Sequence, residues 1–120
     1  MVQQSIIQIK SFSFALDTIK LYIQLQEERE WVLSKQLLRS GTAIGANVEE
    51  ATGGQSKKDF LSKMSIASKE ARETVYWLRL LKESELTKID VSKYLEKSLE
   101  LVRILSTIVK TMENKLRTKN

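Results

Sequence analysis

The chain has 120 residues, the usual size of a single domain, and residues 1–120 are predicted to form one. It contains no proline and no cysteine, which leaves it free to be helical throughout and excludes disulfides and thiolate metal sites. Because histidine, the commonest general base, is also absent, we expect neither an enzyme nor a bound cofactor. No apolar run approaches the roughly 18 residues that span a bilayer, and the first residues do not read as a secretory signal, so a cytoplasmic protein is expected.

The net charge of +5 is unevenly distributed along the chain. Seven Lys and Arg balance seven Asp and Glu in residues 1–60, whereas residues 61–120 hold thirteen against eight. A basic half attracts polyanions such as RNA or DNA, although a solvated surface with a slight lysine excess explains the same numbers. The candidate phosphate contacts in this half are Lys63, Arg79, Lys97, Arg103 and Lys110.

The first helix is predicted over residues 5–26, and it carries apolar side chains on more than one face. One face has alternating spacings of three and four, through Ile9, Phe12, Leu16, Ile19 and Ile23. Phe14, Leu21 and Leu25 lie off that face and form an extra apolar strip. Two apolar strips on one helix predict a second partner surface.

The second helix, predicted over residues 30–52, has small residues at its middle, with Gly41, Gly45 and Ala46 as close-packing positions. Two glycines inside a helix cost roughly 1 kcal/mol each relative to alanine, so a sequence that keeps them usually gains the close approach of a neighbouring helix. The alternative, a phosphate-binding glycine loop, lacks the Gly-Lys-Ser/Thr ending and the preceding strand. The predicted buried face is Ser34, Leu37, Gly41, Ile44, Val48 and Ala51.

Turn signals place the remaining helices over residues 57–82 and 90–117. Gly53-Gly54 predicts a left-handed end to the second helix, and Ser56 and Asp90 are the predicted N-caps of the third and fourth. The third helix has an apolar stripe through Phe60, Met64, Ala67, Ala71, Thr74, Leu78 and Leu81. The fourth holds a heptad spacing through Val91, Leu95, Ser98, Val102, Leu105, Val109, Met112 and Leu116.

Four amphipathic helices with short connections predict an all-α fold, an antiparallel up-down-up-down four-helix bundle. Several of these helices have more apolar surface than one bundle core consumes. Surplus apolar faces on a soluble protein usually form an interface, so a homo-oligomer is predicted.

Five polar residues lie near the apolar seams of the second and third helices: Arg39, Asn47, Glu50, Glu70 and Glu73. Because buried polar groups need partners, they are predicted to form an inter-helix network that specifies packing. The rival explanation is an all-carboxylate metal site, which is unusual without histidine. Its ligands would be Glu49, Glu50, Glu70 and Glu73.

Tyr76 and Trp77 are the aromatic candidates for stacking on nucleotide bases. At helical spacing within an apolar helix, such residues are more often core or interface anchors, and that is the prediction here. No zinc finger or RNA-binding sheet motif accompanies them.

The stretch from Gln36 to Leu81 resembles the four-helix-bundle family encoded in the intervening sequences of bacterial 23S ribosomal RNA genes. The matching residues are Arg39-Ser40-Gly41-Thr42-Ala43-Ile44-Gly45-Ala46-Asn47, Glu49-Glu50-Ala51, Ser56, Asp59-Phe60, Ile66-Ala67, Glu70-Ala71-Arg72-Glu73-Thr74 and Tyr76-Trp77-Leu78. The resemblance implies a bundle that assembles into a ring, a homopentamer. It extends to the accessory variability proteins of diversity-generating retroelements, which are basic barrels that bind nucleic acid and a partner reverse transcriptase.

Three functions are compatible with the sequence. The first is a non-enzymatic oligomeric bundle protein that binds nucleic acid, a ribonucleoprotein or a reverse-transcriptase partner through its basic surface. The second is a scaffold for protein–protein interaction, whose charge serves only solubility. The third, and the least favoured, is a metal-dependent enzyme built on the glutamates.

Overall fold

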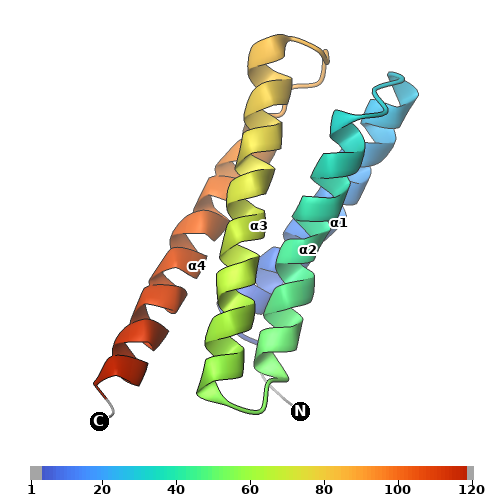
Figure 1. Cartoon of the computed structure of the whole chain (residues 1–120). Coiled ribbons are helices and arrows are strands. Elements are labelled where there is room, and N and C mark those ends of the chain that lie inside the picture. Colours follow the sequence, from blue (N-terminus) through green and yellow to red (C-terminus); the bar gives the residue numbers. More distant parts are fainter. Residues whose placement is uncertain (1–3, 119–120) are drawn as a thin grey trace.

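The computed structural model describes residues 4–118, and over that part of the chain the structure is all-α without strands, as predicted. The helices are α1 (Ile6–Glu27), α2 (Leu33–Thr52), α3 (Lys57–Ser84) and α4 (Ser92–Arg117). Figure 1 shows each helix running back beside the one before it, through short connections. None of the helices described is long and apolar enough to cross a membrane.

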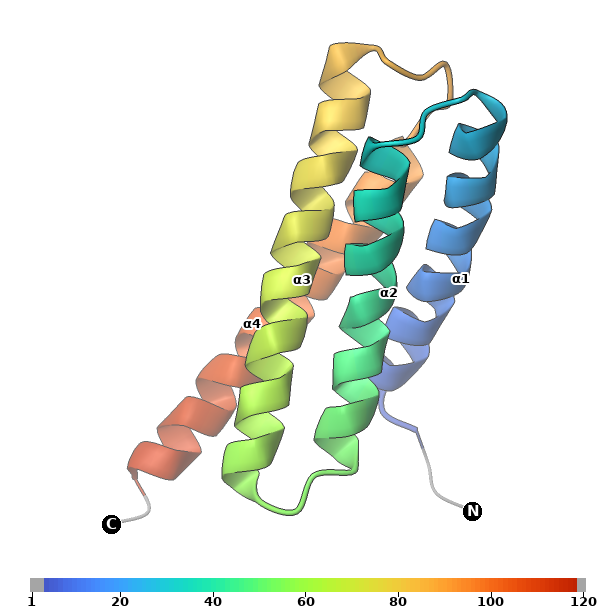
Figure 2. The ribbon, with the colours of Figure 1, turned by 45° about the vertical axis from the view of Figure 1, so that its right-hand side comes forward.

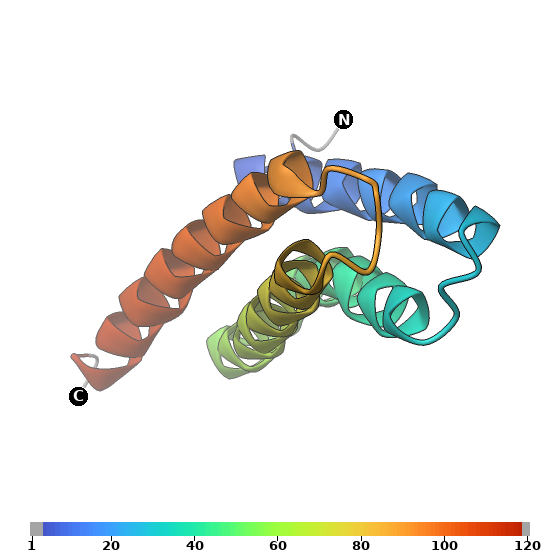
Figure 3. The same ribbon diagram turned by 90° about the horizontal axis from the view of Figure 1, so that it is seen from above.

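The side of the bundle between α1 and α4 is the most open. Helices α1 and α2, α2 and α3, and α3 and α4 pack extensively, whereas α1 and α4 make the least extensive of the four contacts. Figures 2 and 3 both show the C-terminal end of α4 directed away from α1. Two ion pairs join the helices where they do meet, Lys10–Glu100 at 3.1 Å and Lys97–Asp17 at 2.8 Å.

Helix α1 has two apolar faces, and the more apolar of the two is the one that the structure leaves exposed. The five-residue strip is exposed, with exposed fractions between 40% and 64%; we name it the α1 outer face, and it comprises Ile9, Phe12, Leu16, Ile19 and Ile23. The buried face is the other strip, completed by small polar residues: Ile7, Ser11, Phe14, Thr18, Leu21 and Leu25. Both strips have the spacing of a helix face, so periodicity alone does not distinguish them.

The glycines of α2 explain which face of α1 is buried. A Cβ atom on Gly41 would lie 2.7 Å from Cγ2 of Thr18, and one on Gly45 would lie 3.3 Å from the backbone oxygen of Ser11. The α1 strip that carries serine and threonine therefore packs against the glycines, because only small side chains permit this close approach. Ala46, by contrast, is exposed, so its prediction as a close-packing residue is wrong.

The predicted stripes of the other helices supply most of the core. All six residues of the predicted α2 face are buried, and every residue of the α3 stripe is buried except Phe60, which is half-buried. In α4 only Ser98, Leu101 and Leu105 are fully buried. Most of its heptad residues are half-buried, since α4 packs on α3 along its length but on α1 only in part.

The helix ends follow the predicted caps with three corrections. The first is that α2 begins at Leu33 and not at residue 30, because the Glu30 carboxylate accepts hydrogen bonds from the N–H groups of Val32, Leu33 and Ser34 ahead of the first turn. Ser56 caps α3 by accepting a hydrogen bond from the Asp59 N–H at 3.1 Å. Asp90 accepts one from the Ser92 N–H at 3.0 Å, but Val91 is the N-cap, and the helix begins at Ser92, two residues after the predicted start at residue 90.

The left-handed backbone lies elsewhere than predicted. Gly53 has φ −88°, and neither glycine of the α2–α3 turn has a positive φ. The left-handed residues are Arg29 and Glu85, in the other two turns. Gly54 is needed for space instead, because a Cβ atom there would lie 3.1 Å from the carbonyl oxygen of Ala51.

Candidate nucleic-acid interface

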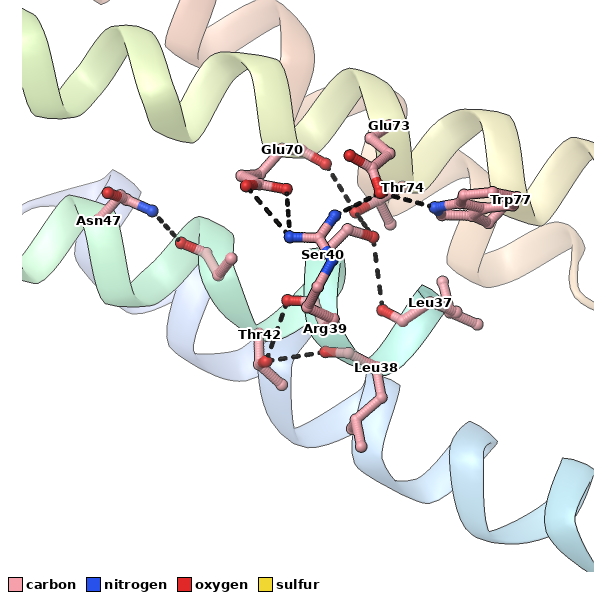
Figure 4. A network of polar contacts seen from close by, with 11 residues as sticks. Leu37, Leu38, Arg39, Ser40, Thr42, Asn47, Glu70, Glu73, Thr74 and Trp77 are labelled. Atoms are coloured by element: carbon pink, nitrogen blue, oxygen red, sulfur yellow. Dashed lines mark hydrogen bonds and ion pairs between the residues drawn. The ribbon is translucent and has the colours of Figure 1, made fainter. Parts of the chain in front are cut away.

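A cluster of polar side chains links α2 to α3 (Figure 4). Arg39 reaches across from α2, with Nη1 3.2 Å from Oε1 of Glu70. Its Nη2 donates a hydrogen bond to Oε2 of Glu73. The indole Nε1 of Trp77 donates to the same Glu73 oxygen at 2.9 Å. These contacts fix the register of α3 against α2.

Glu73 is held in its ionised form by its donors. The hydrogen bond from Trp77 lowers the pKa of the Glu73 carboxyl below its ordinary value of 4.5, and Arg39 lowers it further against the opposing effect of burial. The hydrogen bond from Arg39 to Glu73 raises the pKa of Arg39. A lowered carboxyl pKa stabilises the fold above the ordinary glutamate pKa, and this contribution is lost as the pH falls through the folded-state value.

Replacing Trp77 with phenylalanine is expected to raise the pKa of Glu73 toward 4.5, since the substitution removes the Nε1 donor and keeps an aromatic ring. NMR titration of the Glu73 carboxyl measures this value directly. The variant should also lose less stability than the wild type between about pH 6 and about pH 3. Tyr76→Phe is the matched control, and an unchanged Glu73 pKa in Trp77→Phe would assign the effect to Arg39 alone.

The other two residues of the predicted network make separate contacts. Asn47 Nδ2 donates to the carbonyl oxygen of Ala43 in its own helix at 2.9 Å, and Glu50 pairs with Lys63 at 3.1 Å. A rise of about 1.5 Å per residue places them about 12 Å and about 17 Å along α2 from Arg39, beyond the reach of its side chain. The structure thus divides the predicted five-residue network.

The four glutamates considered as metal ligands are likewise not gathered at one point. Glu70 and Glu73 contact Arg39, whereas Glu49 and Glu50 are exposed near the end of α2. No group of three or more acidic side chains placed to hold a metal ion occurs in residues 4–118.

Of the five candidate phosphate contacts, two form ion pairs with acidic side chains of neighbouring helices, away from the other three. Lys63 pairs with Glu50 of α2. Lys97 pairs with Asp17 of α1, whose carboxylate raises the pKa of the lysine. Cations that are already ion-paired contribute less to the affinity for an external anion than unpaired cations do.

The other three candidates lie along one surface shared by α3 and α4. The Nη2 atom of Arg72 donates to Oγ of Ser106 at 3.1 Å, which places these edges of the two helices side by side. Arg103 and Lys110 lie three residues before and four residues after Ser106, so they share its side of α4. We name this surface the α3–α4 basic face, and it comprises Lys58, Lys69, Arg72, Arg79, Arg103, Lys110 and Arg117, all exposed.

Few cations of the α3–α4 basic face form ion pairs, although exposed Glu113 lies on the same side of α4, between Lys110 and Arg117. Within residues 4–118, the ion pair of Arg79 with Glu83, at 3.2 Å between exposed side chains, is the one made by a cation of this face. Arg103, Lys110 and Arg117 repeat every seven residues, about 10.5 Å apart along α4. The heptad repeat of these cations is a sequence pattern that predicts a charged ridge along α4. It includes Arg117, which the count of charges in the two halves of the chain does not identify.

Fold and surface together define a small helical protein with one basic face and one exposed apolar face. The chain belongs to the 23S rRNA-intervening sequence protein family, whose family model matches residues 3–107. It is also similar to a solved crystal structure, that of a protein with unknown function from the S23 ribosomal protein family of Bacteroides thetaiotaomicron. The two chains are 44% identical with a TM-score of 0.82, and the match covers 88% of this chain and 99% of that one. No curated protein is significantly similar to the chain.

Proposed function

We propose that this protein is a non-enzymatic oligomeric bundle protein that binds the phosphate backbone of nucleic acid through the α3–α4 basic face. The observation that supports this is a surface of seven exposed cations, of which Arg79 alone forms an ion pair within the described part of the chain. Contacts from lysine and arginine to phosphate position a nucleic acid without reading its bases. The same surface would serve a ribonucleoprotein, or the RNA bound by a reverse-transcriptase partner.

The triple variant Arg72→Gln/Arg103→Gln/Lys110→Gln is expected to bind a mixed-sequence oligonucleotide about 100-fold more weakly at low salt, because it removes three phosphate contacts. Fluorescence anisotropy over a salt series measures both the affinity and its salt dependence. The slope of log K against log salt should decrease in magnitude by about 2 to 3, since each phosphate contact contributes somewhat less than one.

The matched control is Lys10→Gln/Lys63→Gln/Lys97→Gln, which removes the same charge from cations that are already ion-paired. Its affinity should stay within about threefold of the wild type, since paired cations release few counterions. Equal losses in both variants would mean that net charge, and not this face, drives binding. Wild-type binding that does not weaken with salt would exclude the mechanism.

We also propose that copies of the chain assemble through the α1 outer face, in a ring of five as the family resemblance implies. The strip has the alternating three-and-four spacing of a coiled-coil seam, and roughly 500 Å² of it is exposed, at the upper end for a monomer. Exposed Lys20 and Glu27 lie at its edge and end, whereas Lys10 and Asp17 lie nearer α4, with which they form ion pairs.

The alternative function is a scaffold whose partner is another protein. The exposed apolar strip on α1 favours it, because such faces bind protein surfaces independently of charge. Capture of the same partner with and without nuclease treatment would support this function, and loss of the partner after nuclease would support nucleic-acid binding.

A further inference from the structure

Tyr76 lies in the middle of the cations of α3. Its side chain is 54% exposed, so it is neither a core residue nor covered within the chain. Arg72 and Arg79 lie four residues before it and three residues after it, which places all three on one side of the helix. Lys69, a further turn away, extends the same row. An exposed aromatic ring therefore has positive charge on both sides along the helix axis.

The neighbours of this ring are held in place by the rest of the structure. The Tyr76 ring meets Trp77 edge-on, with centroids 5.2 Å apart and planes at 69°. Trp77 is itself fixed by its hydrogen bond to Glu73, and Arg72 by its bond to Ser106. A ring braced in this way loses little conformational entropy when a ligand packs on it.

We propose that Tyr76 is a stacking platform for an unpaired base, so that the α3–α4 basic face binds single-stranded nucleic acid in preference to duplex. The inference rests on the proposed function, because the flanking cations are what bring the strand to the ring. Bases in a single strand have free faces that stack on aromatic side chains irrespective of sequence. In a duplex the same faces are covered by neighbouring base pairs, and a base must first be unstacked to reach the ring.

The test compares a single-stranded RNA of about 12 nucleotides with an RNA hairpin that has the same number of phosphates and whose two strands are joined by a non-nucleotide linker, so that the hairpin has no unpaired base. Tyr76→Leu is expected to weaken single-strand binding about tenfold, the size of one lost stacking contact, and to leave hairpin binding unchanged. Tyr76→Phe keeps the ring and should retain affinity within about twofold. Leucine is a good helix former at an exposed position, so the variant should fold.

Trp77 provides a second readout that does not depend on affinity. The chain has two tryptophans, so Trp31→Phe leaves Trp77, next to the Tyr76 ring, as the single tryptophan, whose emission is excited selectively above the absorption of tyrosine. Binding of the single strand should change the emission of Trp77, and binding of the hairpin should not. The emission change should persist in Tyr76→Phe and disappear in Tyr76→Leu.

Each of the other outcomes overturns the inference. Equal weakening of single strand and hairpin by Tyr76→Leu would make Tyr76 a general structural residue. A fall in solution mass of Tyr76→Leu, measured by light scattering, would make it an anchor between copies. If the Arg72→Gln/Arg103→Gln/Lys110→Gln variant loses binding and Tyr76→Leu does not, the basic face stands and the stacking platform fails; if wild-type binding is independent of salt, both fail.

Discussion

Replacing Gly41 with valine is expected to lower the free energy of unfolding by about 3 kcal/mol, the upper part of the range for overpacking a core. A Cβ atom at this position would lie 2.7 Å from Cγ2 and 2.8 Å from Oγ1 of Thr18. Thr18 has little freedom to move away, since it is buried and its Oγ1 donates to the Phe14 carbonyl oxygen at 2.8 Å. Thermal unfolding followed by circular dichroism should show a melting temperature lower by roughly 10–15 °C.

Two further variants test the cause of this loss. Ala46→Val introduces the same side chain at an exposed position of α2, so it should cost only about 0.5 kcal/mol of helix propensity. Gly41→Ala should destabilise the wild type more than it destabilises Thr18→Ala, because the alanine at residue 18 lacks the Cγ2 and Oγ1 atoms and leaves only its Cβ atom, at 3.2 Å, next to the new methyl group. If Gly41→Ala stabilises both backgrounds, α1 and α2 are not in steric contact at this position.

The double variant Phe12→Glu/Leu16→Glu is expected to convert the proposed assembly of copies into folded single chains of 13.8 kDa. Both side chains lie on the α1 outer face, with exposed fractions of 64% and 47%, so glutamates there meet water in an isolated chain. In an interface between copies, the same carboxylates would be desolvated without partners, at a cost of several kcal/mol. Light scattering gives the solution mass, and circular dichroism checks that the helix content is retained.

Thr107→Glu/Thr111→Glu is the matched control, because it places two carboxylates at the same spacing on an exposed part of α4. It should keep the mass of the wild type. An assembly that survives Phe12→Glu/Leu16→Glu would place the contact between copies on another face. A wild-type mass of one chain would exclude self-association altogether.

The buried face of α2 was predictable from the sequence, while that of α1 was not, and the difference has a physical reason. In α2 a single strip combines the helical period with glycines, so only one face suits close packing. In α1 the more apolar strip is the exposed one, because the strip next to the α2 glycines contains Ser11 and Thr18. Hydrophobicity ranks the two strips by composition, whereas packing selects the one with the right shape.

The basic surface was predictable in part for a similar reason. Arg79, Arg103 and Lys110 lie on the α3–α4 basic face, but Lys63 and Lys97 are neutralised across helices. The partner of Lys97 lies 80 residues away along the chain, and no local pattern indicates such a pairing. The fold decides which cations are free, and the sequence alone gives only their number.

The α1 outer face also bears on how stable the protein is at low concentration. Helix α1 buries four large apolar side chains in the core but leaves the five large side chains of the α1 outer face exposed in a single chain. Full burial of a side chain of this size contributes roughly 1.5–3 kcal/mol. If the side chains of the α1 outer face are buried only between copies, folding and assembly are linked by mass action. Newly made chains without partners would then be the least stable form of the protein, and cellular proteases would clear them before the assembled form.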